Sequence, residues 1–293
     1  MSLKLSMNNL IIGSSGKIGF YYSQRTKLKN NIFVSRKKDK KNKFLKFNFG
    51  KIIFKNFLKK KKISRVVIFT AISDPLKCEM NKKESHNVNI IFIKKLIDIL
   101  IKENIYFIFF SSEYIFSGRD KVLYKEHTKP NSRMLYGKQK IEIENYIKKK
   151  KYNNFLVLRL TKTYGDNIND KTLFSETLKQ YTNGKRLFEV ANDQHFKPLY
   201  VNDLIKILDY FLRKRITGIF NVCGDQYMSR FNFIRMMFKF LDINDIVLKK
   251  CSIKKFDNKI YFPKKLNLSN KKIKNKIGIK FTNFTKVLKK IYV

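Results

Sequence analysis

The sequence is poor in the residues on which several protein classes depend. Its 293 residues contain no Trp, three Cys, three His, four Pro and 11 Gly. The three Cys lie far apart, which gives no disulfide framework and suits a reducing compartment, and no His has metal-ligand spacing to another. No apolar run approaches the ~20 residues that span a bilayer, and no signal-peptide layout opens the chain. We therefore expect a cytoplasmic protein with no metal site and no membrane insertion.

Acidic residues are scarce relative to basic ones. The chain has 22 Asp and Glu against 65 Lys and Arg, a formal net charge of +43. Such a balance ordinarily suggests nucleic acid or an anionic membrane. However, the excess is mostly Lys, 54 against 11 Arg, and it is spread along the whole chain. Since Arg dominates base recognition and Lys has A/T-rich codons, codon drift is the preferred interpretation. We expect no specific nucleic-acid partner, and a polyanion-binding protein is an alternative supported by charge alone.

A glycine-rich turn is the most specific motif. Gly13, Gly16 and Gly19 directly follow the apolar run Leu10–Ile12 and precede a helix-like segment. A strand, a glycine turn and a helix N-terminus form an anion site, because backbone N–H groups and the helix dipole point at the phosphates. Glycine also lets the backbone approach them closely. We interpret the turn as a dinucleotide-binding motif, the alternative being an ordinary turn before a helix.

Short apolar runs alternate with longer mixed segments in the first half of the chain. We predict strands at residues 8–12, 31–35, 44–49, 65–70, 106–110 and 155–160, and helices at 17–28, 86–102 and 136–150. The strand runs lack polar alternation, which indicates a parallel sheet covered on both faces. The sequence therefore predicts an α/β fold built on a doubly wound parallel sheet, with its ligand crevice at the carboxyl ends of the strands.

The pattern is looser after residue 160. Helices are predicted at residues 172–182, 202–214, 229–241, 269–277 and 282–291, with a short strand at 218–222. No linker rich in Pro, Gly or Ser separates the halves. We predict a dinucleotide-binding domain over residues 1–163 and a smaller C-terminal substrate lobe over 164–293. Within that lobe, residues 196–222 are expected to pack back on the first domain.

One Tyr–Lys pair stands out from five that share the spacing i, i+4. The spacing alone is uninformative in a chain so rich in Lys and Tyr, but Tyr136 and Lys140 lie one loop beyond an apolar strand that ends in Ser111 and Ser112. One helical turn puts the phenol and the ammonium on one face, and the Lys charge lowers the pKa of the Tyr. Such a Tyr can protonate a carbonyl oxygen while a hydride reaches the carbon, and Ser112 can hold that oxygen. The alternative role of Ser112 is a strand-end cap.

The order of these motifs resembles the extended short-chain dehydrogenase/reductases. Within that superfamily the chain looks most like the dTDP-4-dehydrorhamnose reductases and their sugar-nucleotide-binding relatives. Ser111–Gly118 (SSEYIFSG) is similar to the reductases' STDYVFDG, and Leu158–Gly165 (LRLTKTYG) to their iRtswvyG. Cys78-Glu79 with Val88-Asn89, and Asp193–Leu204, resemble further segments of the family. The likeness covers nearly the whole chain and implies a Rossmann-type sheet.

The resemblance also implies roles for individual residues. Tyr136 would be the general acid, Lys140 would hold the nicotinamide ribose, and Ser112 would bind the reacting oxygen. The other cofactor-binding residues would be Gly13, Ser15, Gly16, Lys17, Ile18, Gly19, Arg36, Ala71, Ser73 and Asn89. The substrate-binding residues would be Glu113, Tyr114, Thr161, Gln194 and Pro198. Glu113 stands where the reductases have Asp, and Tyr114 replaces an acid that related dehydratases need.

The turn after the second predicted strand indicates which dinucleotide is bound. An NAD site usually has an acid about 20 residues past the glycines, which bonds to the ribose hydroxyls. Here that place reads Ser35-Arg36-Lys37-Lys38. Because Arg is scarce in this chain and its fork suits a 2′-phosphate, we expect NADPH in preference to NADH.

These features together predict an NAD(P)H-dependent oxidoreductase that reduces a nucleotide-activated 4-keto sugar destined for cell-surface polysaccharide. A basic protein suits the anionic diphosphate of such a substrate. One alternative is a nucleotide-sugar epimerase of the same superfamily, which returns its cofactor unconsumed. Another is a non-catalytic sugar-nucleotide-fold protein that regulates a partner, although the Ser112, Tyr136 and Lys140 trio disfavours it. A homodimer is compatible with each of these functions.

Overall fold

The computed structural model describes residues 7–36, 38–47, 50–167, 170, 172–256 and 260–292. The chain forms two compact units, each assembled from three stretches of sequence. The first unit comprises Met1–Ser111, Gln139–Leu158 and Ile205–Ile219, and the second comprises Ser112–Lys138, Arg159–Leu204 and Phe220–Val293. Over the described ranges, no helix combines the length and the apolar character needed to cross a membrane.

Most of a seven-stranded sheet belongs to the first unit. Its strands, in spatial order, are β12 (Gly218–Val222), β7 (Phe155–Leu160), β5 (Tyr106–Ser112), β4 (Ile63–Ile68), β1 (Asn8–Ile12), β2 (Asn31–Ser35) and β3 (Leu45–Lys46). The pairs β1–β2, β2–β3, β1–β4 and β4–β5 are parallel. Because the strand order reverses between β1 and β4, the predicted doubly wound α/β fold is confirmed.

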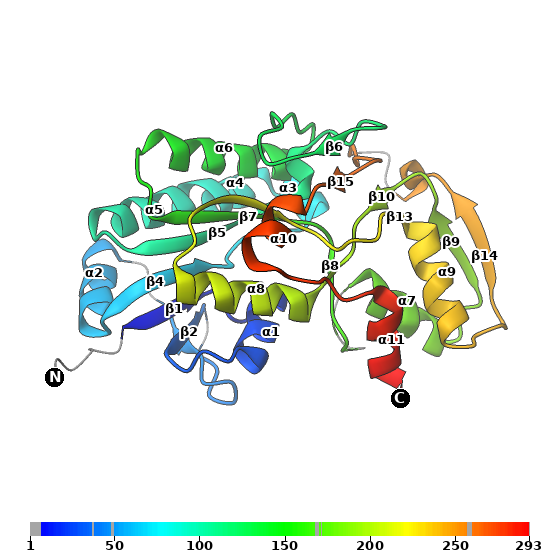
Figure 1. Ribbon diagram of the computed structural model, residues 1–293, viewed down its shortest axis with the longest axis horizontal. Helices are drawn as coiled ribbons and strands as arrows, with labels where there is room; N and C mark the ends of the chain where they lie inside the picture. Colours follow the sequence, from blue (N-terminus) through cyan, green and yellow to red (C-terminus); the bar gives the residue numbers. More distant parts are fainter. Residues whose placement is uncertain are drawn as a thin grey trace. The chain divides into compact units, whose positions relative to one another are not determined.

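Helices cover both faces of this sheet. The helices of the first unit are α1 (Lys17–Arg25), α2 (Lys51–Lys60), α3 (Pro75–Met80), α4 (Lys82–His86), the π-helix η1 (Asn87–Phe92), α5 (Ile93–Lys102), most of α6 (Leu135–Lys149) and most of α8 (Val201–Lys214). One sheet face packs against α2, α5 and α6 in a single apolar cluster. Figure 1 shows α5 and α6 on one side of the sheet and α1 and α8 on the other.

Burial on both faces explains the missing polar alternation. Leu10 and Val66 belong to the apolar cluster under α2, α5 and α6, whereas the next residues, Ile11 and Val67, are equally buried toward the opposite face. On that opposite face the hydroxyl of Tyr22 in α1 donates to the carboxylate of Asp209 in α8 at 2.9 Å. A strand with two covered faces is apolar at most positions.

Two predicted boundaries differ from the structure. The predicted helix 17–28 ends at Arg25, because Thr26 has an extended backbone and its hydroxyl donates to Asp209 at 2.7 Å. The predicted strand 65–70 is shifted to Ile63–Ile68, because its partner β1 ends at Ile12 and the chain then enters the glycine turn. Of the predicted strand 44–49, residues 48 and 49 lie outside the described residues.

Two short helices and α2 were not predicted. Asp74 begins α3 by accepting bonds from the N–H groups of Leu76 and Lys77, with Pro75 in the first turn. This Asp-Pro start is an ordinary helix signal that the sequence analysis did not use. The predicted helix 86–102 is itself a π-helical segment, η1, followed by α5.

The second unit is built from short strands and helices. Its remaining elements are η2 (Glu113–Ile115), β6 (Leu123–Tyr124), β8 (Thr163–Tyr164), α7 (Leu173–Thr182), β9 (Leu187–Ala191), β10 (His195–Phe196), β11 (Leu199–Tyr200), β13 (Met228–Ser229), α9 (Arg230–Phe240), β14 (Val247–Cys251), η3 (Ile253–Lys255), β15 (Asn267–Leu268), α10 (Lys271–Ile277) and α11 (Phe284–Tyr292). The helices predicted after residue 160 are confirmed to within about two residues at each end.

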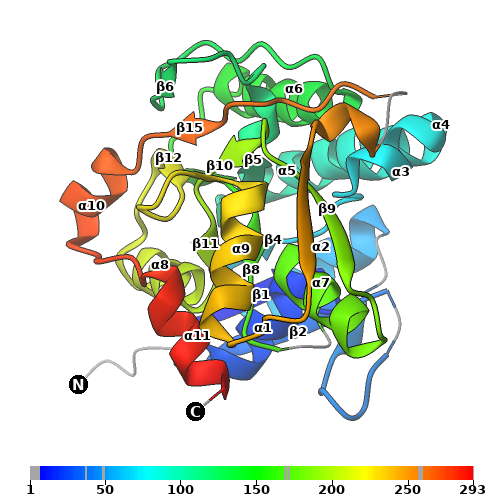
Figure 2. The same ribbon diagram turned by 90° about the vertical axis from the view of Figure 1, so that its right-hand side faces the viewer.

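A parallel ribbon of β9 and β14 is the largest feature of the second unit that the sequence analysis missed. The two strands pair from Leu187 opposite Val247 to Ala191 opposite Cys251. Helix α9 lies alongside this ribbon (Figure 2), and the rings of Phe188 in β9 and Phe238 in α9 are 5.1 Å apart.

Candidate active site

The predicted dinucleotide motif forms the tight connection between β1 and α1. Gly13 has a φ of +93°, and a Cβ added there would lie 2.8 Å from the backbone nitrogen of Thr70. A Cβ on Gly19 would collide with the carbonyl oxygen of Gly13. Gly16 caps α1 without a side-chain hydrogen bond, and the first turn of α1 carries no acid. These features leave the helix N-terminus open to an anion.

Several predicted cofactor-binding residues lie along one edge of the sheet, beside this turn. The N–H groups of Gly13 and Ser14 both donate to the carbonyl oxygen of Val34, at 3.2 and 3.1 Å. Val34 is two residues before Arg36, which follows β2 and is exposed. The contact between Gly13 and Thr70 brings the turn to the end of β4, directly before Ala71. The structure thus brings together three segments that the sequence analysis assigned to the cofactor.

The remaining residues of the motif differ in exposure. Ser15, Gly16 and Lys17 are exposed at the turn, Ile18 is half-buried, and Gly19 is buried. In the loop after β4, Ala71 is half-buried and Ser73 is exposed. Exposed backbone at a glycine turn is what a phosphate group would require.

Asn89 is buried in the π-helix η1 and is fixed to the loop after β4. Its Oδ1 accepts the N–H of Ile72 at 2.8 Å, and its Nδ2 donates to the carbonyl oxygen of Ile72 at 3.0 Å. The two bonds attach this side chain to the backbone between Ala71 and Ser73. Single π-helical turns are frequent at functional sites.

Lys140 is almost completely buried in the first unit, with 4% of its surface exposed. Its Nζ donates to the carbonyl oxygen of Phe110 at 2.7 Å and lies 4.6 Å from the centre of the Phe109 ring. Burial lowers the pKa of Lys140 from 10.5 to about 8, while the nearby Cys78 and Glu144 act in the opposite direction. A lysine in such surroundings can exchange its proton near neutral pH.

Tyr136 lies one turn before Lys140 on α6, as predicted, but belongs to the second unit. The phenol is buried, and its ring centre is 6.5 Å from that of Tyr114, nearly perpendicular to it. The adjacent Gly137 has no room for a side chain, because a Cβ there would collide with Ser132 and with the carbonyl oxygen of Tyr114. Close packing therefore holds this end of α6 against the segment that follows β5.

Ser112 ends β5 and caps the short helix η2. Its Oγ accepts the N–H of Tyr114 at 3.2 Å, so the cap role that the sequence analysis considered is real. The cap uses the oxygen as an acceptor and leaves the hydroxyl hydrogen able to donate. Capping and oxygen binding are therefore compatible in one side chain.

Glu113 is a fully buried acid in the second unit. Its Oε1 accepts the backbone N–H of Lys162 at 3.2 Å, and its Oε2 has no hydrogen-bond partner among the residues that the structure describes. Burial raises the pKa of Glu113 from 4.5 to about 8, against the opposing charge of Lys162. The side chain is thus readily protonated near neutral pH and could meet a polar group of a ligand.

Two further predicted substrate residues, Thr161 and Gln194, form hydrogen bonds to the backbone within the second unit. The hydroxyl of Thr161 donates to the carbonyl oxygen of Lys197 at 2.7 Å, next to the buried Pro198. Gln194 donates from Nε2 to the carbonyl oxygen of Pro263 at 3.2 Å. Its Oε1 is buried without a partner in the described part of the chain.

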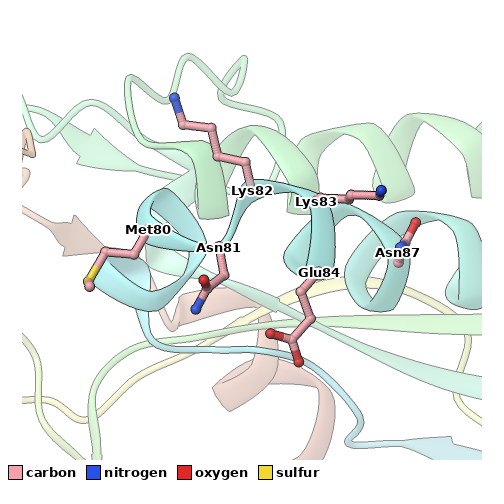
Figure 3. A pocket seen from close by; sticks show the side chains of 6 residues that line it. All are labelled: Met80, Asn81, Lys82, Lys83, Glu84 and Asn87. Atoms are coloured by element: carbon pink, nitrogen blue, oxygen red, sulfur yellow. The ribbon is translucent and has the colours of Figure 1, made fainter.

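A hollow on the first unit does not coincide with these residues. It lies at the junction of α3 and α4 and is lined by Met80, Asn81, Lys82, Lys83, Glu84 and Asn87 (Figure 3). The side chains of Lys82 and Glu84 extend in opposite directions (Figure 3). None of the predicted cofactor or substrate residues lines it.

Comparisons with known proteins identify the family and the fold. A family model described as the RmlD substrate binding domain matches residues 7–293. A dTDP-4-dehydrorhamnose reductase of Aggregatibacter actinomycetemcomitans is 25% identical over 166 residues, 55% of this chain and 55% of that protein. The match therefore spans about half the length of this curated relative.

Solved structures of low identity share the fold. A dTDP-4-dehydrorhamnose reductase from Yersinia enterocolitica has a TM-score of 0.84 at 17% identity, covering 98% of this chain and 99% of that one. A reductase of the same name from Bacillus anthracis, in complex with NADP, has a TM-score of 0.82 at 15% identity, with coverage of 98% and 99%. These neighbours confirm the Rossmann-type fold, and since the family model covers nearly all of the sequence, the chain belongs to the RmlD substrate binding domain family.

Proposed function

We propose that this protein is an NADPH-dependent reductase of a nucleotide-activated 4-keto sugar, similar to the dTDP-4-dehydrorhamnose reductases. The observation that carries the proposal is helix α6, on which a buried phenol, Tyr136, and a buried ammonium, Lys140, stand one turn apart. The family membership of the chain supports the same reaction class. Such a phenol can act as a general acid toward a carbonyl oxygen, and a neighbouring ammonium favours the phenolate that remains.

The glycine turn fits a dinucleotide. Gly13 and Gly19 lie where a Cβ would collide with backbone, and the N-terminus of α1 has neither a side-chain cap nor an acid. The phosphates would lie against this turn, with Asn89 and the loop from Ala71 to Ser73 beside the nicotinamide half. When bound, reduced nicotinamide supplies the hydride for the C4 carbon of the sugar.

The residues of the protein then bind the C4 oxygen of the sugar and supply its proton. Tyr136 gives its phenolic proton to the C4 oxygen, and the Ser112 hydroxyl donates a hydrogen bond to the same oxygen. The ammonium of Lys140 stabilises the phenolate that remains. Because the pKa of Lys140 is near 8, this ammonium is protonated at neutral pH and loses its effect in more alkaline solution.

Arg36 supports NADPH as the preferred cofactor. It is exposed directly after β2, and the acid that an NAD site usually has there is missing. A guanidinium can bond a 2′-phosphate through two N–H groups. The Bacillus anthracis structural neighbour was solved with NADP.

The second unit would hold the sugar nucleotide. Glu113, Tyr114, Thr161, Gln194 and Pro198 all belong to it, and two of these residues keep a buried oxygen without a partner among the described residues. A buried carboxyl group and a buried amide oxygen suit the hydroxyls of a sugar, which both donate and accept hydrogen bonds. We therefore propose that the first unit binds the dinucleotide and the second the sugar.

Turnover with a defined substrate tests the proposal. The purified chain is incubated with NADPH and dTDP-4-dehydrorhamnose, and loss of nicotinamide absorbance is followed together with the sugar product. Stoichiometric consumption of NADPH with formation of the 4-hydroxy sugar is expected. An epimerase would change the sugar and leave the cofactor unconsumed, and a non-catalytic relative would bind both compounds without converting either.

A further inference from the structure

A buried chain of hydrogen bonds runs through the first unit beside the proposed cofactor site. Its members Asn89 in η1, Gln139 in α6 and Ser85 in α4 are all buried. The Ile72 N–H donates to Asn89 Oδ1 at 2.8 Å, and Asn89 Nδ2 donates to Gln139 Oε1 at 2.7 Å. Gln139 Nε2 donates to Ser85 Oγ at 3.0 Å, and Ser85 Oγ donates to the carbonyl oxygen of Lys82 at 3.0 Å.

The direction of this chain is determined at each step. The oxygen of the Asn89 amide is engaged by the Ile72 N–H, and its nitrogen donates both to Ile72 O and to Gln139. Gln139 must therefore present its oxygen to Asn89 and its nitrogen to Ser85. Only a side chain with one acceptor end and one donor end meets both demands, so the amide is matched to its place.

The chain joins three segments that the proposed function assigns to the cofactor. Ile72 lies between Ala71 and Ser73, Asn89 is itself one of the assigned residues, and Gln139 directly precedes Lys140. Consecutive helical side chains point about 100° apart. An anchor at Gln139 therefore fixes the rotation of α6, and with it the direction in which Lys140 leaves the helix.

We propose that Gln139, supported by Ser85, is a positioning residue for Lys140 and Asn89. This inference rests on the proposed reduction. Gln139 acts through its neighbours, because its side-chain bonds go to Asn89 and Ser85. Without these bonds α6 can turn or slide slightly against η1, and a displacement of about 1 Å at a reacting group can lower a rate by up to about 100-fold.

The test uses two single variants, their combination and a matched control. Gln139→Met keeps the length of the side chain and removes both bonds, and Ser85→Ala removes the support. Glu142→Gln is the control, because Glu142 also joins α6 to α5, through an exposed ion pair of 2.6 Å with Lys94. For each protein, kcat, KM for the sugar nucleotide, the Kd of NADPH and the pH profile of kcat are measured.

A positioning role predicts a specific pattern. In Gln139→Met, kcat falls about tenfold and the Kd of NADPH rises, while KM for the sugar changes less than about twofold. The alkaline limb of the kcat profile shifts, since Cys78 on α3 changes its distance from the Lys140 Nζ, while Glu144 moves with Lys140 on α6. The kcat of the double variant is no lower than that of Gln139→Met alone, because both substitutions interrupt the same chain of hydrogen bonds. Glu142→Gln behaves as wild type.

Two results would overturn the inference. One is an unchanged kcat and pH profile in a folded Gln139→Met protein. The other is a fold-loss of kcat in the double variant that equals the product of the losses in the two single variants. If the wild-type protein reduces no keto sugar, the proposed function fails. The positioning role of Gln139 is then still tested by the Kd of NADPH and its pH dependence. Equal values of both in wild type and Gln139→Met then refute positioning by Gln139.

Discussion

Burial acts in opposite directions on one ionisable side chain in each unit. In the first unit it lowers the pKa of Lys140 to about 8, and in the second it raises the pKa of Glu113 to about 8. The cause is the same, because a buried site disfavours the charged form of either group. Each unit therefore contains one buried ionisable group with a pKa of about 8, a lysine in the first unit and a glutamate in the second.

The surroundings of the two groups differ. The Lys140 ammonium has a carbonyl partner and an aromatic face, and the next residue, Gln139, belongs to a closed chain of hydrogen bonds. Glu113 keeps Oε2 without a partner among the described residues. A buried polar atom left unpaired costs about 1–3 kcal/mol, which a ligand can offset. We infer that the Lys140 ammonium is fixed by the protein's own residues, whereas Glu113 keeps one carboxyl oxygen available to a ligand.

The largest effect is expected from the phenol of Tyr136 on α6. Tyr136→Phe removes the proton donor, so we expect kcat to fall by about 10²–10⁴ while the Kd of NADPH is unchanged. Tyr146→Phe is the matched control. Tyr146 is on the same helix as Tyr136 and has the same spacing to Lys150, the first residue after the helix, but its hydroxyl donates to Asp98 on the surface at 2.6 Å. Equal activity in the two variants would mean that Tyr136 is not the acid.

A substitution at Arg36 tests cofactor binding independently of sugar binding. Arg36→Ala removes a charge-assisted bond to a 2′-phosphate, so KM for NADPH is expected to rise on the order of tenfold. KM for NADH and for the sugar nucleotide should not change, since the sugar is assigned to the second unit. Lys38→Ala, an exposed change in the same turn, is the control. A parallel rise in the KM for NADH would refute 2′-phosphate recognition.

Two glycines with similar backbone angles compare packing in the two units. Gly13 has a φ of +93° with Thr70 only 2.8 Å from a Cβ, and Gly184 has a φ of +90° with no atom within 4 Å. Both Ala variants suffer the backbone strain, but only Gly13→Ala adds a collision. We expect Gly13→Ala to be less stable than Gly184→Ala by about 1–3 kcal/mol in denaturant unfolding. An equal loss of stability in the two variants would show that the glycine turn adjusts to the added methyl group.

Stability should depend on pH with opposite slopes for the two buried groups. Folded Glu113 holds a proton between pH 4.5 and about 8 that the unfolded chain has released, so its contribution to stability falls as pH rises through this window. Folded Lys140 has lost a proton between pH 8 and 10.5 that the unfolded chain still holds, so its contribution rises there.

Two neutral variants measure these slopes. Relative to wild type, Glu113→Gln should gain free energy of unfolding between pH 4.5 and 8, and Lys140→Met should lose it between pH 8 and 10.5. Each slope has a limit of about 1.4 kcal/mol per pH unit. Urea unfolding at a series of pH values gives both. A flat difference for either variant would show that the residue titrates alike in the folded and unfolded chain.

The elements that the sequence predicted well carry strong local patterns. Mostly apolar runs such as 8–12 and 155–160 predicted the buried strands, and the amphipathic pattern of residues 202–214 predicted α8. β14 has the exposed sequence Val247–Cys251, with Lys249 and Lys250, and becomes a strand because β9 pairs with it. The π-helix η1 was also missed, because its side-chain pattern continues that of the helix after it.

The candidate site divides in the same way. The sequence by itself determined the glycine turn and the Tyr136–Lys140 spacing, because each depends on a few consecutive residues and on the geometry of one strand, turn or helix. Only the tertiary structure decided that Lys140 and Glu113 are buried and that Gln139 is bonded on both sides. These properties come from Phe110, Lys162, Asn89 and Ser85, which are between 30 and 54 residues away along the chain. Desolvation and hydrogen bonding act through space, so they follow the packing of the chain and not its order.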